Sequence, residues 1–133
     1  MTSVEQMAIS TGDDVVRVRQ LVRGRAQAAR LSLVDQTKLV TAASELARNI
    51  VTYGGSGMVR VETVTKDSRQ GIQATFSDSG PGIPDLELAL TDGWTSGNGL
   101  GLGLSGARRL VDEFAIDSKV GQGTIVTVVK WTR

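Results

Sequence analysis

The chain contains 133 residues, 15 of them basic and 14 acidic, and it has neither cysteine nor histidine. This length predicts one compact domain over residues 1–133, and the missing side chains exclude disulfides, cysteine nucleophiles, Ser-His-Asp relays and zinc sites of thiolate or imidazole. Because the net charge is only +1 and aromatic residues are few, we expect a protein that does not bind nucleic acid. No apolar run is long enough to cross a bilayer, so we expect the protein to be soluble and cytoplasmic and not to bind a membrane.

A short strand is expected near residues 4–10, followed by two amphipathic helices over residues 13–30 and 32–53. In both helices apolar residues recur at every third or fourth position, which places them on one buried stripe. The predicted buried residues are Val15, Val18, Val22, Ala26 and Ala29 in the first helix and Leu39, Ala43, Leu46 and Ile50 in the second.

The second helix has sequence signals at both ends. Ser32 and Asp35 have the spacing of a capping box, in which each side chain accepts a hydrogen bond from an unpaired backbone N–H. A glycine cluster ends the helix, at Gly54, Gly55 and Gly57. The face opposite the buried stripe is expected to carry Lys38, Glu45 and Asn49.

The middle of the chain predicts a hairpin and a loop. Residues 58–66 and 71–78 are rich in Val, Thr, Ile and Phe around a polar break, which is typical of two paired strands. One face of the second strand is expected to present Ile72, Ala74 and Phe76. Both prolines lie within residues 78–84, so that segment is expected to form a shaped loop.

A third helix and a second hairpin are expected to complete the fold. The glycine-rich residues 97–103 lead into the helix, whose predicted buried face is Leu104, Ala107, Val111 and Phe114. Strands over residues 116–120 and 124–131 then flank a glycine-rich turn. The order of elements predicts a two-layer α/β sandwich, with helices on one face of a mixed, mostly antiparallel sheet of about five strands.

Three groups of residues could carry chemistry, and the first lies on the second helix. Glu45 and Asn49 are four residues apart, so their side chains share one helix face. A carboxylate and an amide oxygen suit Mg²⁺, and the same carboxylate could instead accept a proton from an attacking hydroxyl group. A pair of solvated side chains is the alternative interpretation.

The second group is the loop at the end of the first hairpin. Asp78 precedes Gly80, Pro81 and Gly82, and the glycines would let the backbone approach a flat ligand closely. A carboxylate there can accept a hydrogen bond from adenine N6, whereas guanine would present an oxygen at the same edge. An ordinary turn that begins with an aspartate is the alternative.

The third group is the glycine-rich stretch before the third helix. Backbone N–H groups and the positive end of a helix dipole form phosphate-binding loops. Residues 101–106 match G-x-G-x-x-G, but they lack the preceding strand and the later acidic residue of a dinucleotide fold, and no Gly-Lys pair supports a Walker loop. A flexible hinge is the alternative.

The three groups together resemble the GHKL family, which includes gyrase, the heat-shock chaperone ATPase, MutL and histidine kinases. Residues 45–49 resemble its N box, residues 78–82 its G1 box and residues 99–103 its G2 box, followed by Gly123 and Thr124. A branch of free-standing serine/threonine switch kinases of bacterial stressosomes is most similar. That similarity extends over Val34-Asp35-Gln36, residues 44–50, Asp112-Glu113-Phe114 and Lys130-Trp131.

The resemblance implies the Bergerat fold, ATP and Mg²⁺ as cofactors, and a role for each matched residue. Glu45 would be the general base, Asn49 the Mg²⁺ ligand and Asp78 the acceptor for adenine N6. Further contacts to the nucleotide are implied for Gly80, Gly82, Gly99, Leu100, Gly101, Gly103 and Thr124. Phosphoryl transfer requires mainly positioning and charge stabilisation, which such a set can supply.

The resemblance also implies a function. Since the chain has no histidine to receive phosphate, the acceptor must be another molecule. By resemblance the acceptors are STAS-domain antagonist and scaffold proteins of a stressosome, and the released kinase activates a PP2C-type phosphatase by binding it. One alternative is an anti-sigma factor kinase of the same fold, which also binds a sigma factor. Another is a binding module that uses ATP only as a conformational switch.

Overall fold

A computed structural model describes residues 4–83, 89–90 and 103–133 of the chain. The predicted site residues Gly99, Leu100 and Gly101 lie outside the described residues. The elements in chain order are β1 (Val4–Ile9), α1 (Gly12–Ala28), α2 (Leu33–Asn49), the π-helical turn η1 (Ile50–Gly54), β2 (Gly57–Lys66), β3 (Arg69–Asp78), α4 (Gly103–Arg109), β4 (Glu113–Lys119) and β5 (Gly123–Trp131).

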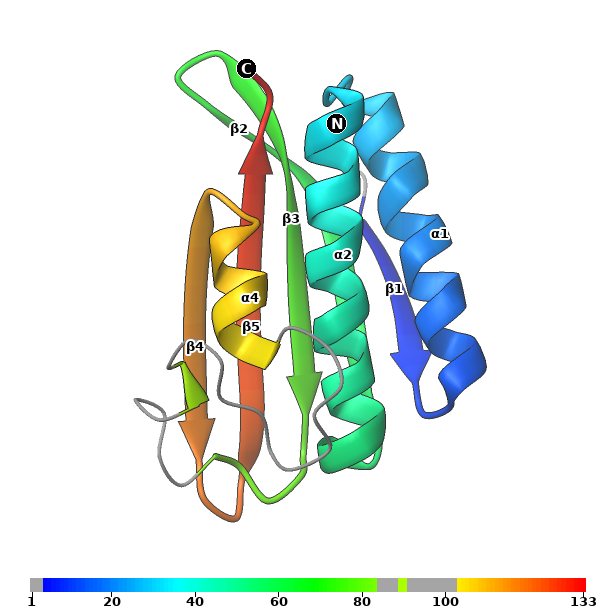
Figure 1. Cartoon of the computed structure of the whole chain (residues 1–133), viewed down its shortest axis with the longest axis vertical. Helices are drawn as coiled ribbons and strands as arrows, with labels where there is room; N and C mark the ends of the chain where they lie inside the picture. The colour runs from blue at the N-terminus through cyan, green and yellow to red at the C-terminus, as the bar shows by residue number, and fades with distance from the viewer. Residues whose placement is uncertain (1–3, 84–88, 91–102) are drawn as a thin grey trace.

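The five described strands form one sheet in the order β1-β2-β3-β5-β4. Helices α1, α2 and α4 lie side by side over one face of this sheet (Figure 1). The predicted two-layer α/β sandwich is therefore confirmed. The sheet is expected to be mixed but mostly antiparallel, and each neighbouring pair of the described strands is antiparallel.

The hydrophobic core fills the space between the two layers. The predicted stripes of α1 and α2 are buried, and so are Ile72, Ala74 and Phe76 of β3. Val59 and Val61 of β2 and Val126 and Val128 of β5 complete the same surface at alternate positions. Spacings of three to four residues in helices and two in strands therefore place these residues on one shared core.

The third helix is shorter than the sequence predicts. Leu104 and Ala107 of α4 are buried as expected, but α4 ends at Arg109. Phe114 belongs to β4, where it lies opposite Val128 of β5. Residues 104–114 fit a helical spacing, but Phe114 and Ile116 also fit a strand spacing, and pairing with β5 decides between the two.

Helix α2 is buried more extensively than its sequence pattern predicts, because it lies between α1 and α4. Lys38 is exposed as expected, and Asn49 is half-buried. Glu45 is buried, with only 8% of its surface exposed. The expectation that Glu45 projects from a polar outer face is therefore wrong. No described helix combines the length and the apolar character that a membrane crossing requires.

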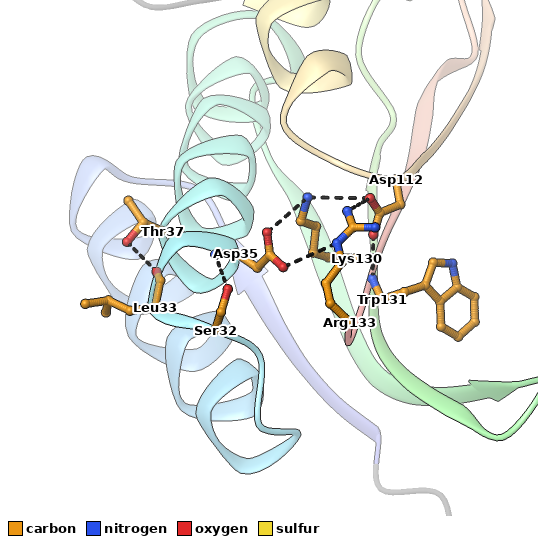
Figure 2. A network of polar contacts seen from close by, with 8 residues as sticks. All are labelled: Ser32, Leu33, Asp35, Thr37, Asp112, Lys130, Trp131 and Arg133. Carbon is orange, nitrogen blue, oxygen red and sulfur yellow. Dashed lines mark hydrogen bonds and ion pairs between the residues drawn. The ribbon is translucent and has the colours of Figure 1, made fainter.

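The start of α2 is joined to the end of β5 by a group of charged residues, here called the charge cluster: Asp35, Asp112, Lys130 and Arg133. Lys130 Nζ lies 3.5 Å from an oxygen of each aspartate (Figure 2). Arg133 reaches the same two carboxylates, at 2.6 Å from Asp112 and 3.6 Å from Asp35. Lys130 is only 3% exposed, so its charge is balanced inside the protein.

Half of the predicted capping box is present. The Ser32 hydroxyl group accepts a hydrogen bond from the backbone N–H of Asp35 at 3.1 Å. The Asp35 carboxylate instead faces Lys130 and Arg133 (Figure 2). The sequence spacing could not indicate this partner, because Lys130 approaches Asp35 only through the tertiary fold.

The charge cluster predicts acid sensitivity. Burial by itself would raise the pKa of the Asp112 carboxyl group. The hydrogen bond from the backbone N–H of Trp131 and the positive charges of Lys130 and Arg133 outweigh this effect and hold the pKa below its ordinary value of 3.8. The ionised carboxylate therefore stabilises the folded state at pH values above 3.8. This contribution is lost as the pH falls from 3.8 through the lower pKa of the folded state. In urea titrations from neutral pH down to about pH 2, Asp112→Asn should show a flatter decline in unfolding free energy than the wild type. A parallel decline in both proteins would contradict this prediction.

Candidate functional site

A cavity of about 420 Å³ lies beside the C-terminal end of α2, next to the end of β3 and the start of β5. Its volume is in the range of small-molecule sites. The apolar lining includes Leu46, Ile50, Phe76, Ile83, Leu104 and Val126. The polar lining includes Asn49, Tyr53, Asp78 and Thr124. A mainly apolar wall with a few polar side chains is suited to a flat, partly polar ligand.

Asp78 is the last residue of β3, and its carboxylate is fixed by the loop that follows. Its Oδ1 accepts a hydrogen bond from the backbone N–H of Gly80 at 2.9 Å. A Cβ atom at Gly54 would lie 2.6 Å from Asp78 Cγ, so only glycine leaves room for this carboxyl group. Sequence reasoning treated Gly54 only as a helix stop and missed this role, because Gly54 and Asp78 are distant in sequence.

Gly82 lines the cavity, and its backbone also explains why glycine is present. Its φ of +78° lies in the left-handed region, and a Cβ atom there would collide with the backbone oxygen of Lys119. The loop after β3 is thereby packed against the end of β4. Gly80, the other glycine predicted in this loop, contacts the cavity wall through the hydrogen bond from its backbone N–H to Asp78.

Thr124 lies opposite Asp78 in the β3–β5 register, so both side chains reach the same cavity. Its Oγ1 is 2.8 Å from the hydroxyl oxygen of Ser118 on β4. The Ser118 oxygen also accepts the backbone N–H of Ile83 at 2.8 Å. Ser118 therefore holds Thr124 and the glycine loop together, a function that its sequence context did not reveal.

The two predicted residues on α2 have different surroundings. Asn49 lies on the cavity wall, at the last position of the helix. Glu45 lies one turn earlier and forms an ion pair with Arg48 at 2.7 Å. Glu45 is not among the described residues that line the cavity. Gly103 begins α4, next to Leu104 on the cavity wall.

The structure thus brings Asn49, Asp78, Gly82 and Thr124 around one cavity. Among the described residues no cluster of three or more acidic side chains could hold a metal ion by itself. Mg²⁺ commonly takes only one or two protein oxygens and completes its shell with phosphate and water. The amide oxygen of Asn49 on the cavity wall fits that kind of donor set.

Comparison with known proteins gives the family. Residues 34–132 match the family described as histidine kinase-, DNA gyrase B- and HSP90-like ATPases. The serine/threonine-protein kinase RsbT of Bacillus subtilis (strain 168) is 43% identical over 125 residues, which cover 94% of each chain. The anti-sigma F factor of Pasteuria penetrans is 34% identical over 107 residues, which cover 74% of this chain and 70% of that one.

A solved structure has the same fold at lower identity. The RsbU and RsbW domains of a Mycobacterium tuberculosis protein superpose with a TM-score of 0.64 and 22% identity. The match covers 97% of this chain and 33% of that longer one. The chain belongs to the family of histidine kinase-, DNA gyrase B- and HSP90-like ATPases.

Proposed function

We propose that this chain is an ATP- and Mg²⁺-dependent protein serine/threonine kinase of the RsbT type that acts in the cytoplasm. Its acceptors are STAS-domain antagonist and scaffold proteins of a stressosome, and once released it activates a PP2C-type phosphatase by binding. The observation that carries the proposal is the convergence of Asn49, Asp78, Gly82 and Thr124 on one cavity, in a chain matched over 94% of its length by a relative named as such a kinase.

In the proposed complex the cavity holds the adenine. Apolar side chains of the cavity wall, Ile50 and Phe76 among them, contact the base, and the Asp78 carboxylate accepts a hydrogen bond from its exocyclic amine. Thr124, held by Ser118, offers a hydroxyl group at the same edge. The fixed carboxylate rejects guanine, since an oxygen at that position would face a second acceptor.

Phosphoryl transfer then requires an aligned hydroxyl group and a proton acceptor. Glu45 takes the proton of the acceptor Ser or Thr hydroxyl, the hydroxyl oxygen bonds to the γ-phosphorus, and the bond from that phosphorus to the bridging oxygen breaks to release ADP. Asn49, one turn after Glu45 on α2, would hold Mg²⁺. When bound, Mg²⁺ supplies charge stabilisation for the phosphate oxygens.

The decisive test is incubation of the chain with radiolabelled ATP and STAS-domain proteins encoded beside it. We expect label on a serine or threonine of at least one of these proteins, and stimulation of a PP2C-type phosphatase by the chain alone. No labelled acceptor, together with intact phosphatase stimulation, would support the alternative of an ATP-switched binding module.

One specific observation favours a second candidate function, that of an anti-sigma factor kinase. Several relatives that are 30–34% identical are named anti-sigma F factors. Such a kinase would hold a sigma factor and phosphorylate an anti-anti-sigma factor. Stoichiometric capture of a sigma factor by the purified chain would favour this candidate, whereas capture of a PP2C-type phosphatase would favour the first.

The adenine contact can be tested with Asp78→Asn. This change removes the charge from the carboxylate and should weaken ATP binding about tenfold or more, as expected for loss of a charged hydrogen bond. Isothermal calorimetry with a non-hydrolysed ATP analogue measures the effect. Asp117→Asn is the matched control, because Asp117 is an exposed acid on β4 that does not line the cavity. Equal affinities in the wild type and Asp78→Asn would rule out the contact.

A further inference from the structure

Glu45, the residue to which we assign proton transfer, is held by a neighbour on its own helix. The side chain of Glu45 is 10% exposed, whereas that of Arg48 is 47% exposed. Arg48 Nη1 donates a hydrogen bond to Glu45 Oε1 at 2.7 Å. This short contact between a guanidinium and a carboxylate is a charge-assisted hydrogen bond with a defined direction.

The guanidinium group also has a second attachment point. Arg48 Nη2 lies 3.4 Å from the hydroxyl oxygen of buried Ser44, one turn earlier on the same side of α2. The two nitrogens of the planar fork therefore contact two adjacent residues of one turn. Positions three and four residues apart on a helix are neighbours, so α2 itself supplies this geometry.

We propose that Arg48 is a positioning residue for the phosphoryl-transfer step, an inference that rests on the proposed function of Glu45. By binding Oε1, Arg48 fixes the orientation of the carboxylate and assigns proton acceptance to the other oxygen, Oε2. It also balances the charge of a carboxylate that is largely removed from water. Asn49, the residue after Arg48, lies on the cavity wall. The two adjacent side chains therefore have separate roles, Arg48 toward the carboxylate of Glu45 and Asn49 toward the nucleotide.

The proposal predicts a specific kinetic signature for Arg48→Ala. Without the guanidinium the carboxylate is free to rotate, and we expect the kcat of acceptor phosphorylation to fall about tenfold to hundredfold, as for other small misplacements of reacting groups. The KM for ATP should stay close to that of the wild type, because Arg48 does not line the adenine cavity. Arg48→Lys keeps the charge but replaces the fork by a single ammonium group, so its kcat should lie between those of wild type and Arg48→Ala.

A double substitution separates this role from a general effect on the helix. If Arg48 acts through Glu45, Arg48→Ala should cause no further loss of kcat in a Glu45→Gln background. Arg17→Ala is the matched control, since Arg17 pairs with the largely buried Asp14 three residues earlier on α1 at 3.1 Å. We expect wild-type kcat for Arg17→Ala.

Two results would overturn the inference. One is a kcat for Arg48→Ala within about twofold of the wild type, and the other is an equal fractional loss in the wild-type and Glu45→Gln backgrounds. Failure of the proposed function would be visible separately, as full kcat in Glu45→Gln or as absence of acceptor phosphorylation by the wild type. All variants are measured with ATP and the STAS-domain acceptor, and thermal unfolding verifies that each is folded.

Discussion

Replacing Glu45 by glutamine should lower phosphoryl transfer to the acceptor by about 10²- to 10⁴-fold, which is the usual contribution of a general base. Glutamine has nearly the same shape as glutamate but cannot accept the hydroxyl proton. The cavity proposed to hold adenine is lined by residues other than Glu45, so ATP binding should be retained. Single-turnover transfer from labelled ATP and calorimetry on the same samples measure the two quantities.

A suitable control for that experiment is Glu62→Gln on β2. Glu62 is also largely buried at its side chain and also has an arginine partner, Arg60, at 3.4 Å, but it belongs to the sheet rather than to α2. We expect wild-type transfer for this variant. Transfer at the wild-type rate in Glu45→Gln would show that Glu45 is not the base. Loss of ATP binding in that variant would show instead that Glu45 acts through the nucleotide.

The second large effect is expected for stability. Lys130→Met removes the buried cation of the charge cluster and leaves Asp35 and Asp112 facing each other with only exposed Arg133 between them. Breaking a buried ion pair in this way typically destabilises a protein by about 3–5 kcal/mol. Such a loss is a large part of the roughly 5–15 kcal/mol that stabilises a typical domain. Urea unfolding followed by circular dichroism measures it.

Two companion variants identify the cause of that destabilisation. Arg133→Met removes a cation whose side chain is 59% exposed, so its effect should be about 1 kcal/mol or less. Lys130→Met combined with Asp35→Asn removes part of the repulsion and should recover stability relative to Lys130→Met alone. An effect of Lys130→Met no larger than that of Arg133→Met would mean that the buried lysine contributes little.

Much of the fold could be predicted because local patterns and the shared core agree. The helical stripe from Val15 to Ala29 and the alternation of Ile72, Ala74 and Phe76 each required only a few neighbouring residues to be recognised. Phe114 was misplaced because the same residues fit two periods, and a distant strand resolves the choice. The burial of Glu45 was missed for a similar reason, since α1 and α4 cover α2 from both sides.

Residues that line the cavity could be predicted from the sequence, but the residues that hold them in place could not. Residue type and spacing predict Asn49 and Asp78, the resemblance to the GHKL family adds Thr124, and the structure brings the three to one cavity. Gly54 and Ser118, which leave room for Asp78 and hold Thr124, were not identified. Their importance depends on contacts between segments that are distant in sequence, so no local spacing could reveal them.

The pairing of β3 with β5 delays completion of the cavity during synthesis of the chain. Asp78, the last residue of β3, is paired with Thr124 at the start of β5, although α4 and β4 lie between them in the chain. Bringing such distant segments together is entropically unfavourable and therefore tends to occur late in folding. A chain that still lacks β5 lacks Thr124 and Val126 of the cavity wall, so a ligand that needs these contacts would stabilise only molecules whose synthesis has passed β5.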